Sequence, residues 1–558
     1  DWSIEADFSL DNPATPGGGA LPGGMGWYRK HFKLSESDKG KVIYIDFDGV
    51  YRNSRVWLNG HLLGFRPNGY VSFRYDLTPY LNYGKEENVL VVQADNSDQP
   101  NSRWYSGSGI YRNVWLVKTG QVHVDNWGTT VTTPVMNADK STVEIERTLK
   151  NEASDVTVEV STLIQDKEGK TLYRISSPAE IAAGGKKIVT HTIEMFYPEL
   201  WSVRNPYLYT AITEVRVGNK LTDRYRTTFG IRKFDWDEHT GFSLNGEPTK
   251  ILGVCLHHDL GCLGSAVNPR ALERQLQMMK DMGANAVRTS HNPPAPELLD
   301  ICDRIGLLVQ DEAFDMWRKR KSPYDYAQYF DEWHEKDLTD QVLRDRNHPS
   351  LLIWTPTNEE FWPDRVQYPR LMHDLYNLTK MIDPTRPFHG ASGGTHIATD
   401  IWTVHNYEQD PAKLKEKLYN GGKLMEAPKW EIHLMPMNIG YNGLKYTDQY
   451  AFPEYKKDMP YLVDEFGGIK WNPSQQMESA QNTSWGYGEP PRSLEEFYAR
   501  LEGQVDAVLS LSNDIWGYCY TQLTDVEQEQ NGIYYYDRTP KFDMKRIHAI
   551  FSKTPDSK

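Results

Sequence analysis

The chain has 558 residues, of which 39% are hydrophobic and 25% are charged, and this balance is typical of a globular protein. No apolar run reaches the roughly 18 residues that a membrane-spanning helix needs. The formal net charge of −14 disfavours nucleic acid, whose phosphates bind basic surfaces. We therefore expect neither a membrane nor a nucleic acid as partner, and the length predicts about three domains.

The counts of aromatic residues and cysteines indicate which class of ligand the protein binds and whether its cysteines form disulfides. The chain contains 17 Trp and 33 Tyr residues, whose flat rings stack on the C–H faces of sugars and also fill β-sandwich cores. They lend mild support to a carbohydrate ligand. Cys255, Cys262, Cys302 and Cys519 lack CxxC spacing, which predicts buried free thiols and neither a disulfide framework nor a zinc knuckle.

The sequence starts at Asp1 without a signal-like segment. A bacterial cytoplasmic protein fits this start, and so does a periplasmic or secreted protein whose leader has been removed. The localisation is therefore left open.

Residues 1–119 are predicted to form a jelly-roll β-sandwich. Residues 54–64 predict a hairpin around the turn dipeptide Asn59-Gly60, a strong hairpin signal between alternating hydrophobic residues. Many short strands punctuated by Gly and Asn are typical of a sandwich or jelly roll. Further strands are expected at residues 41–50, 88–94 and 113–118.

Residues 120–231 are predicted to form a second, immunoglobulin-like β-sandwich. Three segments alternate apolar and polar residues with the period of two that marks a half-buried strand. Residues 198–209 form a Pro-bracketed turn that leads into another strand. The length fits a small sandwich of the immunoglobulin type. The alternating segments are 141–150, 155–165 and 186–193.

Residues 232–558 are predicted to form a (β/α)₈ TIM barrel, because short apolar strands alternate with helical segments over a length that suits this fold. A doubly wound sheet is the alternative, but the chain has no Gly-rich phosphate loop of dinucleotide or P-loop spacing. The predicted strands are 250–256, 285–288, 307–310, 351–354, 401–405, 461–463 and 514–517. The predicted helices are 269–282, 296–305, 326–346 and 494–509.

Polar side chains follow the predicted strands, at the barrel end where enzymes of this fold carry their reactive groups. In the central stretch 345–359, an apolar run leads into Asn358 and Glu359, and another strand leads in the same way into Glu465. Two glutamates on separate strand ends can face each other across a cleft, and such a pair carries most glycosidase chemistry. The other strand ends carry His257-His258-Asp259, Arg288 to Asn292, Asp311-Glu312, His405-Asn406-Tyr407 and Trp516.

A metal hydrolase is the competing hypothesis, with His257, His258, Asp259 and His291 as zinc ligands. Adjacent residues on a strand point to opposite faces, so His257 and His258 are poorly placed to share one ion. The sequence therefore favours a site without a metal and without a cofactor.

Four segments together carry a family resemblance. Residues 345–359 resemble the acid/base signature of glycoside hydrolase family 2, the family of β-galactosidases, β-glucuronidases and β-mannosidases, and residues 285–291 resemble its other signature. Residues 103–114 resemble the family's sugar-binding-domain motif, and residues 198–209 resemble the end of its immunoglobulin-like domain. The resemblance covers all three predicted domains in order.

The resemblance implies a retaining mechanism, with Glu359 as general acid/base and Glu465 as nucleophile. Asn358 resembles the residue that binds the sugar 2-hydroxyl, and Tyr407 resembles the tyrosine that hydrogen-bonds the nucleophile. The chemistry asks for a cation that keeps the nucleophile ionised and for surroundings that keep the acid protonated. Arg288 resembles the residue that supplies the cation. The remaining candidates at the sugar subsite are His257, His291, His405 and Trp516.

Departures from the family pattern narrow the range of sugars that we expect the enzyme to accept. Residues 529–531 are Glu-Gln-Asn, where β-glucuronidases carry an Asn-x-Lys carboxylate clamp, although Lys470 offers another cation near Glu465. Residues 314–317 lack the acid and histidine that hold magnesium in some β-galactosidases. We therefore predict an exo-β-galactosidase that acts on oligosaccharides or glycosides, and self-association into a homo-oligomer is left open. The alternatives are another glycone (glucuronic or galacturonic acid, mannose, arabinose) and a non-catalytic carbohydrate-binding protein.

Overall fold

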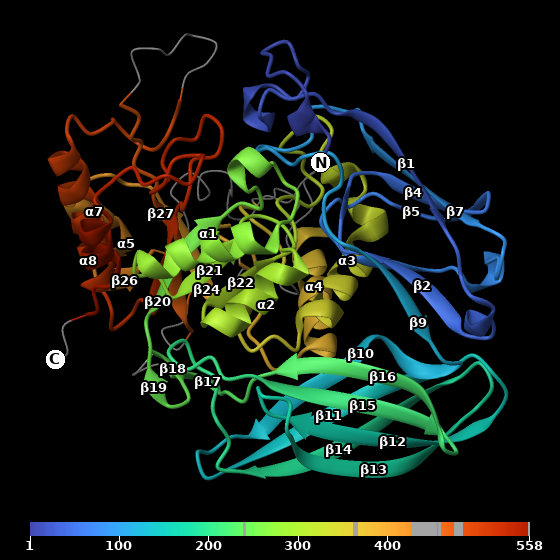
Figure 1. The fold of residues 1–558 in the computed structure, drawn as a ribbon. Coiled ribbons are helices and arrows are strands. Elements are labelled where there is room, and N and C mark those ends of the chain that lie inside the picture. Colours follow the sequence, from blue (N-terminus) through green and yellow to red (C-terminus); the bar gives the residue numbers. More distant parts are fainter. Residues whose placement is uncertain are drawn as a thin grey trace.

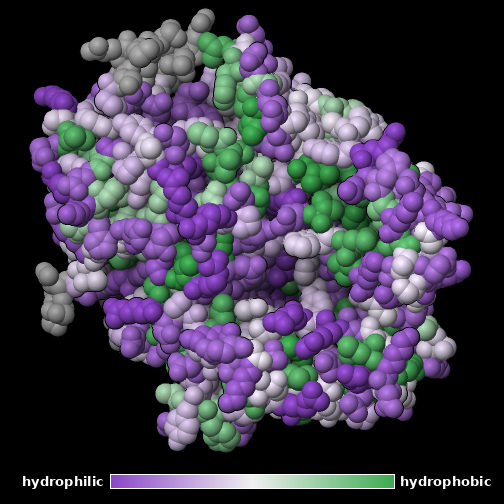
Figure 2. Space-filling view, viewed as in Figure 1, coloured by the Kyte–Doolittle hydropathy of each residue, from purple (hydrophilic) through white to green (hydrophobic). Residues whose placement is uncertain are grey.

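The computed structural model describes residues 1–237, 241–360, 367–394, 396–425, 455, 459–473 and 484–555. Figure 1 shows a blue β-sandwich beside an α/β barrel coloured green to red, with a teal β-sandwich below both. Hydrophilic residues cover most of the face in Figure 2, where the hydrophobic residues form separate small groups. Among the described residues, no helix is long and apolar enough to cross a membrane.

The first β-sandwich contains two main antiparallel sheets. Its hairpin turns at Asn59 and Gly60, whose φ angles are 49° and 85°, as a two-residue turn between right-twisted strands requires. Ile43, Phe47 and Val56 belong to the apolar core that both sheets share. One sheet has the order β1 (Gly24–Phe32), β7 (Asn88–Asn96), β4 (Ser54–Leu58), β5 (His61–Arg66), and the other β6 (Phe73–Asp76), β2 (Val42–Phe47), β9 (Val114–Thr119). The short strands β3 (Val50–Tyr51) and β8 (Gly109–Ile110) pair with each other.

The second β-sandwich also packs two antiparallel sheets. Exposed and buried residues alternate along most of β14, as expected for a strand with one face on the core. One sheet has the order β10 (Val122–Val135), β11 (Lys140–Asn151), β14 (Lys186–Phe196). The other has the order β13 (Thr171–Ile181), β12 (Val156–Gln165), β15 (Tyr209–Val217), β16 (Lys220–Phe229).

The barrel is a ring of parallel strands. Seven of them form one sheet in the order β23, β22, β21, β20, β28, β27, β24. The segment 387–392 lies between the two outer strands, because Phe388 bridges Trp354 on β23 and His389 bridges Ile401 just before β24. The His389 N–H donates to the Trp354 carbonyl at 2.8 Å. This irregular fifth strand closes the ring, and the predicted fold class is confirmed.

The barrel strands are β20 (Ile251–Leu256), β21 (Ala286–Thr289), β22 (Leu308–Glu312), β23 (Leu351–Thr355), β24 (Trp402–Asn406), β27 (Tyr461–Gly467) and β28 (Gly517–Thr521). Its helices, which surround the ring in Figure 1, are α1 (Pro269–Asp281), α2 (Pro296–Ile305), α3 (Phe330–Asp345), α4 (Gln367–Ile382), α5 (Pro411–Leu418), α7 (Leu494–Leu509) and α8 (Met544–Phe551). The strands are buried along their whole lengths, which is typical of a parallel sheet covered by helices. A small hairpin of β25 (Tyr419–Asn420) and β26 (Lys423–Leu424) follows α5.

A three-stranded sheet, β17 (Phe234–Asp237), β18 (Gly241–Leu244) and β19 (Glu247–Pro248), lies at the amino-terminal end of the barrel strands. The ring of Trp236 stacks on that of Trp516, with centroids 5.2 Å apart. The prediction of a last strand at residues 514–517 is wrong, because β28 begins only at Gly517. The chain still turns like a helix before it, since the Ile515 N–H donates to the Leu511 carbonyl at 2.8 Å.

Candidate active site

Three ionisable side chains meet at the carboxyl ends of the barrel strands. Glu465 lies on β27, His405 lies on β24, and Glu359 lies just beyond β23. One carboxylate oxygen or imidazole nitrogen from each of the three lies within 4.8 Å of the others. Glu359 has a φ of 45°, which costs a non-glycine residue free energy, and its N–H donates to the Ser392 carbonyl at 2.8 Å. The structure thus brings together the two glutamates that the sequence singled out.

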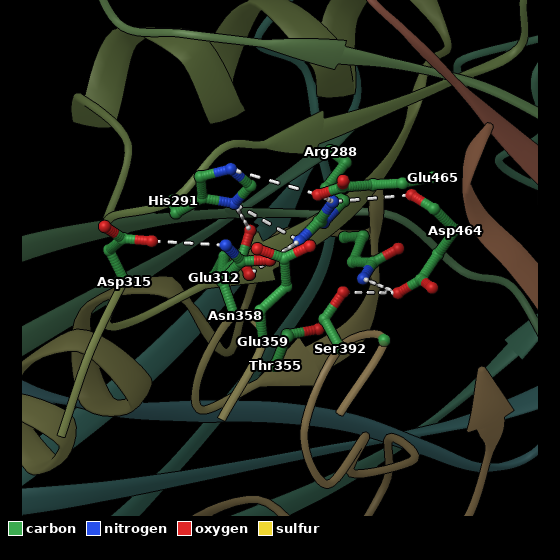
Figure 3. Close-up of polar contacts among 12 residues, drawn as sticks. Arg288, His291, Glu312, Asp315, Thr355, Asn358, Glu359, Ser392, Asp464 and Glu465 are labelled. Atoms are coloured by element: carbon green, nitrogen blue, oxygen red, sulfur yellow. Dashed lines mark hydrogen bonds and ion pairs between the residues drawn. The ribbon is translucent and has the colours of Figure 1, made fainter. Parts of the chain in front are cut away.

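Arg288 is fully buried at the centre of this site and joins its polar groups, as Figure 3 shows. Its Nη1 donates to Glu465 Oε1 at 2.5 Å, and its Nη2 donates to Glu312 Oε1 and Asn358 Oδ1, both at 2.9 Å. Hydrogen bonds between a guanidinium and a carboxylate are short and strong because both partners are charged. Arg288 therefore holds Glu465 and Asn358 in one fixed arrangement.

Tyr407 is a second donor to Glu465. Its hydroxyl donates to Glu465 Oε2 and lies 3.1 Å from the Thr521 hydroxyl. Its ring stacks on Tyr487, with centroids 3.4 Å apart and an interplanar angle of 3°. Because both oxygens of Glu465 have a donor, the orientation of this carboxylate is well defined.

His291 lies beside Glu312 and Glu465. Its Nδ1 is 3.1 Å from Glu312 Oε2, and its Nε2 is 3.9 Å from Glu465 Oε1. Burial and the charge of Arg288 lower the pKa of His291 to about 3, so its imidazole is neutral at ordinary pH. Burial raises the pKa of Glu312 to about 7 although Arg288 opposes the shift. A neutral imidazole and a carboxyl group that can exchange a proton are suited to bind hydroxyl groups.

Asn358 is held by partners on both sides. Its Nδ2 donates to Asp315 Oδ1 at 3.1 Å, and its backbone carbonyl accepts from Lys321 Nζ at 2.7 Å. Together with the bond from Arg288, these contacts fix an amide that is only 1% exposed. A preorganised amide of this kind can bind one sugar hydroxyl in a defined direction.

The first β-sandwich contributes a wall to this site. Arg103 Nε donates to Asp315 Oδ2 at 3.0 Å, and the ring of Trp104 lies 5.0 Å from that of His257 and 5.6 Å from that of His291. A cleft between the two domains lies beside these residues. Its lining includes Tyr51, Asn68, Tyr70, Trp104, His291, Phe314, Asp315 and Tyr326.

The surroundings of Glu359 differ from the expectation for a general acid. His405 Nδ1 lies 3.0 Å from Glu359 Oε1 and 3.2 Å from Glu465 Oε2. Burial opposes ionisation of Glu359, but the hydrogen bond and charge of His405, with Lys321 and Arg103, outweigh it, so the pKa of Glu359 lies well below its usual range. Burial also opposes a charge on His405, yet Glu465 and Asp464 raise the pKa of His405 well above its usual value. The expected surroundings that keep Glu359 protonated are therefore not those that the structure shows.

The placement of Trp516 in the sugar pocket is wrong. Its indole lies among Ile251, Phe242 and Trp236, at the amino-terminal ends of the strands, whereas the carboxylates lie at the carboxyl ends. The error has its cause in the predicted last strand, residues 514–517, because that prediction placed Trp516 at the carboxyl end of the barrel strands. His257, in contrast, lies against Trp104 and His291 at the site.

Several polar residues of the site were not among the sequence candidates. Asp464 directly precedes Glu465, and Arg103 and Trp104 begin the segment that resembles the family's sugar-binding-domain motif, so the sequence contains a signal for these three residues. Nothing local in the sequence marks Ser392, Asp315 or Lys321, because they reach the site only through the folded barrel.

The described residues offer two clusters with the ligand atoms that a cation needs. In one, Glu359 and Glu465 share His405 and the charge of Arg288. In the other, His348 Nδ1 lies 2.6 Å from Asp303 Oδ2, and Asp303 raises the pKa of His348 to about 9 although burial opposes the shift. The charges of His405 and Arg288 in the first cluster and of His348 in the second disfavour an added cation. The zinc hypothesis gains no support, because Asp259 pairs with Arg538 at 2.8 Å and His258 Nε2 lies 3.2 Å from the Ser106 carbonyl of the first domain.

Relatives with known names cover parts of this chain. Over 367 residues it is 56% identical to the β-galactosidase BoGH2A of Bacteroides ovatus, an alignment of 65% of this chain and 43% of that protein. It is 41% identical over 394 residues to a putative β-glucuronidase of Formosa agariphila (70% of this chain, 36% of that protein). It is 32% identical over 429 residues to a β-galactosidase of Thermoanaerobacter pseudethanolicus (75% and 54%). The chain thus spans about half the length of these relatives or less.

Solved structures and family domains agree with these relatives. A crystal structure of a β-glycosidase from Bacteroides vulgatus superposes with a TM-score of 0.79 at 29% identity, covering 99% of this chain and 70% of that one. A glycosyl hydrolase family 2 member from Bacteroides cellulosilyticus gives 0.77 at 33% identity, with 95% and 61% covered. Residues 10–120, 122–232 and 238–554 match, in turn, the sugar binding domain, the family 2 domain that follows it, and the TIM barrel domain of glycosyl hydrolases family 2. The chain belongs to glycosyl hydrolase family 2.

Proposed function

We propose that this chain carries the active site of a retaining exo-β-galactosidase whose substrate is a carbohydrate. The observation that carries the proposal is the distance between the two glutamates, whose nearest carboxylate oxygens lie within 4.8 Å of each other. Retaining glycosidases hold their carboxyl groups about 5–5.5 Å apart, whereas inverting enzymes leave about 6.5–9.5 Å for a water molecule. The short separation supports a nucleophile and an acid/base, not two groups that share a water.

In the proposed reaction, Glu465 attacks the anomeric carbon while the bond to the leaving oxygen breaks. Arg288 and Tyr407 aim its carboxylate, since they donate to different oxygens of it. Glu359 gives a proton to the leaving oxygen and later takes one from the water that releases the sugar. Asn358 is placed to bind a sugar hydroxyl next to the reacting carbon, where hydrogen bonds strengthen towards the transition state.

The neighbourhood of Glu529 favours a neutral glycone over a uronic acid. Burial raises the pKa of Glu529 to about 8, and among its causes is the nearby charge of Glu465. Asn531 Nδ2 donates to Glu529 Oε1 at 3.0 Å, and Lys470 Nζ is engaged with the Ser484 carbonyl at 2.7 Å. A uronate needs a cation, and a carboxyl group that is mostly neutral at ordinary pH does not supply one. The 56% identity to a protein named β-galactosidase points the same way.

Two measurements test the proposal. Proton NMR of an aryl β-galactoside during hydrolysis should show the β-anomer of galactose first, as retention requires. A panel of aryl β-glycosides of galactose, glucuronic acid, mannose and arabinose should give the highest kcat/KM for galactose. Release of the α-anomer first would contradict the nucleophile role of Glu465. A preference for the glucuronide would contradict the argument from Glu529. Self-association into a homo-oligomer, which the sequence leaves open, is a separate question that sedimentation velocity would answer.

A further inference from the structure

His405 is a buried imidazole surrounded by three carboxylates. Its Nδ1 is shared by Glu359 Oε1 at 3.0 Å and Glu465 Oε2 at 3.2 Å. Its Nε2 lies 3.4 Å from Asp464 Oδ1 and 3.0 Å from the Ser392 hydroxyl. A Cβ at Gly393 would lie 2.2 Å from the imidazole Cγ, so the backbone packs against the ring and fixes its orientation. The imidazole therefore connects the two reacting glutamates with a third acid behind them.

Among the described residues, His405 is the charged partner in direct contact with the Asp464 carboxylate, while Arg288 acts on it from farther away. It is 1% exposed, and its Oδ2 accepts from the Ser392 hydroxyl at 2.6 Å. His389 Nε2 is 3.7 Å away, but burial lowers the pKa of His389 to about 3, so that ring is neutral. In the described part of the chain, Asp464 Oδ1 accepts no well-aligned hydrogen bond. A buried carboxylate needs a paired cation, and the imidazolium of His405 supplies one.

A retaining glycosidase needs a proton for its acid while its nucleophile stays ionised. Around Glu359, however, His405, Lys321 and Arg103 supply positive charge and favour the carboxylate form. A proton that belongs to the glutamate pair is thus placed one hydrogen bond away, on His405 Nδ1. The acid must receive this proton at the moment when the leaving oxygen needs it.

We propose that His405, supported by Asp464, is a positioning residue that stores the catalytic proton and exchanges it with Glu359 during each half of the reaction. In the first half, Glu465 attacks the anomeric carbon and the bond to the leaving oxygen breaks. His405 Nδ1 passes its proton to Glu359, and the leaving oxygen takes the bond's electron pair and that proton from Glu359, which is again a carboxylate. His405 becomes a neutral imidazole that keeps its Nε2 proton towards Asp464.

In the second half, the water oxygen attacks the anomeric carbon and the bond to Glu465 breaks. Glu359 takes one proton from the water and passes one to His405 Nδ1, so the site regains its starting protons and charges. The timing follows from electrostatics, because Glu465 loses its negative charge when it bonds the sugar. The imidazolium 3.2 Å away then loses an attractive partner, and its proton becomes easier to release. This inference rests on the proposed retaining mechanism.

The charges that act on His405 come from every element packed around it. The carboxylates are Glu359 after β23 and Asp464 and Glu465 on β27, and the cation behind Glu465 is Arg288 on β21. Within the described ranges, further titratable groups nearby are His389, His396 and Tyr407. Since the carboxylates favour the protonated ring, activity that depends on the stored proton is present at low pH and is lost as pH rises through the His405 pKa.

The first test measures the proton directly and needs no turnover. Histidines labelled with ¹⁵N are titrated by NMR in the full chain, and the His405→Gln variant identifies the His405 signal. We expect His405 to be protonated at pH 7 and to titrate at least about one unit lower in Glu465→Gln, the least shift that a close opposite charge gives. A neutral His405 at pH 7, or a titration that Glu465→Gln leaves unmoved, would overturn the proposal. If His405 titrates as expected but the chain hydrolyses no glycoside, the proposed function is wrong, whereas the assignment of the proton to His405 is confirmed.

The second test measures how the proton is used. His405→Gln keeps an amide donor but cannot carry the proton, so kcat/KM for an alkyl β-galactoside should fall by roughly 100-fold. An activated dinitrophenyl β-galactoside, whose leaving group needs no proton, should lose far less. The alkaline limb of the pH profile should move to lower pH in His405→Gln, and less so in Asp464→Asn. His61→Gln on exposed β5 is the matched control and should change neither quantity. Equal losses on both substrates with an unmoved alkaline limb would reduce His405 to a structural role and overturn the proposal.

Discussion

The two glutamates of the site are held in very different ways. The Glu465 side chain is 6% exposed, lies within a buried strand, and has donors on both carboxylate oxygens. The Glu359 side chain is 30% exposed, follows a strand in a left-handed turn, and contacts His405 through one oxygen. A nucleophile must meet the anomeric carbon at a fixed angle, so a rigid strand suits it. An acid/base must reach a leaving group and then a water, which a more open position allows.

Loss of Glu465, the proposed nucleophile, should give the largest effect. In Glu465→Gln, the amide cannot form the glycosyl bond, so kcat should fall roughly 10⁴-fold or more, measured with an activated aryl β-galactoside. The Glu465→Ala variant makes room for azide, which should restore turnover and give the α-galactosyl azide. Formation of the β-azide in this variant would show that Glu465 and Glu359 have been assigned in the wrong order.

Loss of Glu359, the proposed acid/base, should lower turnover less, and the loss should depend on the leaving group. In Glu359→Gln we expect kcat to fall roughly 10²- to 10⁴-fold for an alkyl galactoside, with a smaller loss for the dinitrophenyl galactoside in the first step. Azide should rescue Glu359→Ala with the β-galactosyl azide as product. A loss that is the same for all leaving groups would contradict proton donation by Glu359.

The contrast between the glutamates also shows what the sequence could predict. An apolar run that ends in a carboxylate marks both strand ends, so Glu359, Glu465 and Asn358 could be located without a structure. The fifth strand could not, because residues 383–392 are rich in Pro, Gly and polar residues and join the ring through isolated bridges. Ser392 and the exchange of charge through His405 depend on that segment. The position of Ser392 and the charge exchange through His405 arise from contacts between residues that lie far apart in the sequence.

The wall from the first domain should contribute binding more than chemistry. Among the described residues, the ring of Trp104 packs on the imidazoles of His257 and His291. In Trp104→Ala we expect KM for an aryl galactoside to rise roughly tenfold, equivalent to about 1.4 kcal/mol, with kcat changed much less. Steady-state kinetics would check this, and a thermal melt close to that of the wild type would show that the domains still pack. A kcat loss as large as that of Glu359→Gln would mean that Trp104 positions the reacting groups.

Trp516 is the matched tryptophan at the opposite end of the barrel, and its effect on catalysis should be the smallest. Its indole is 3% exposed and stacks on Trp236, so Trp516→Ala should lower the free energy of unfolding by about 3–5 kcal/mol. Trp516→Phe keeps most of the packing, and we expect its KM and kcat to match the wild type. Urea unfolding and steady-state kinetics separate the two effects. A large rise in KM for Trp516→Phe with unchanged stability would place this indole at the sugar after all, and the barrel end assigned to it would then be wrong.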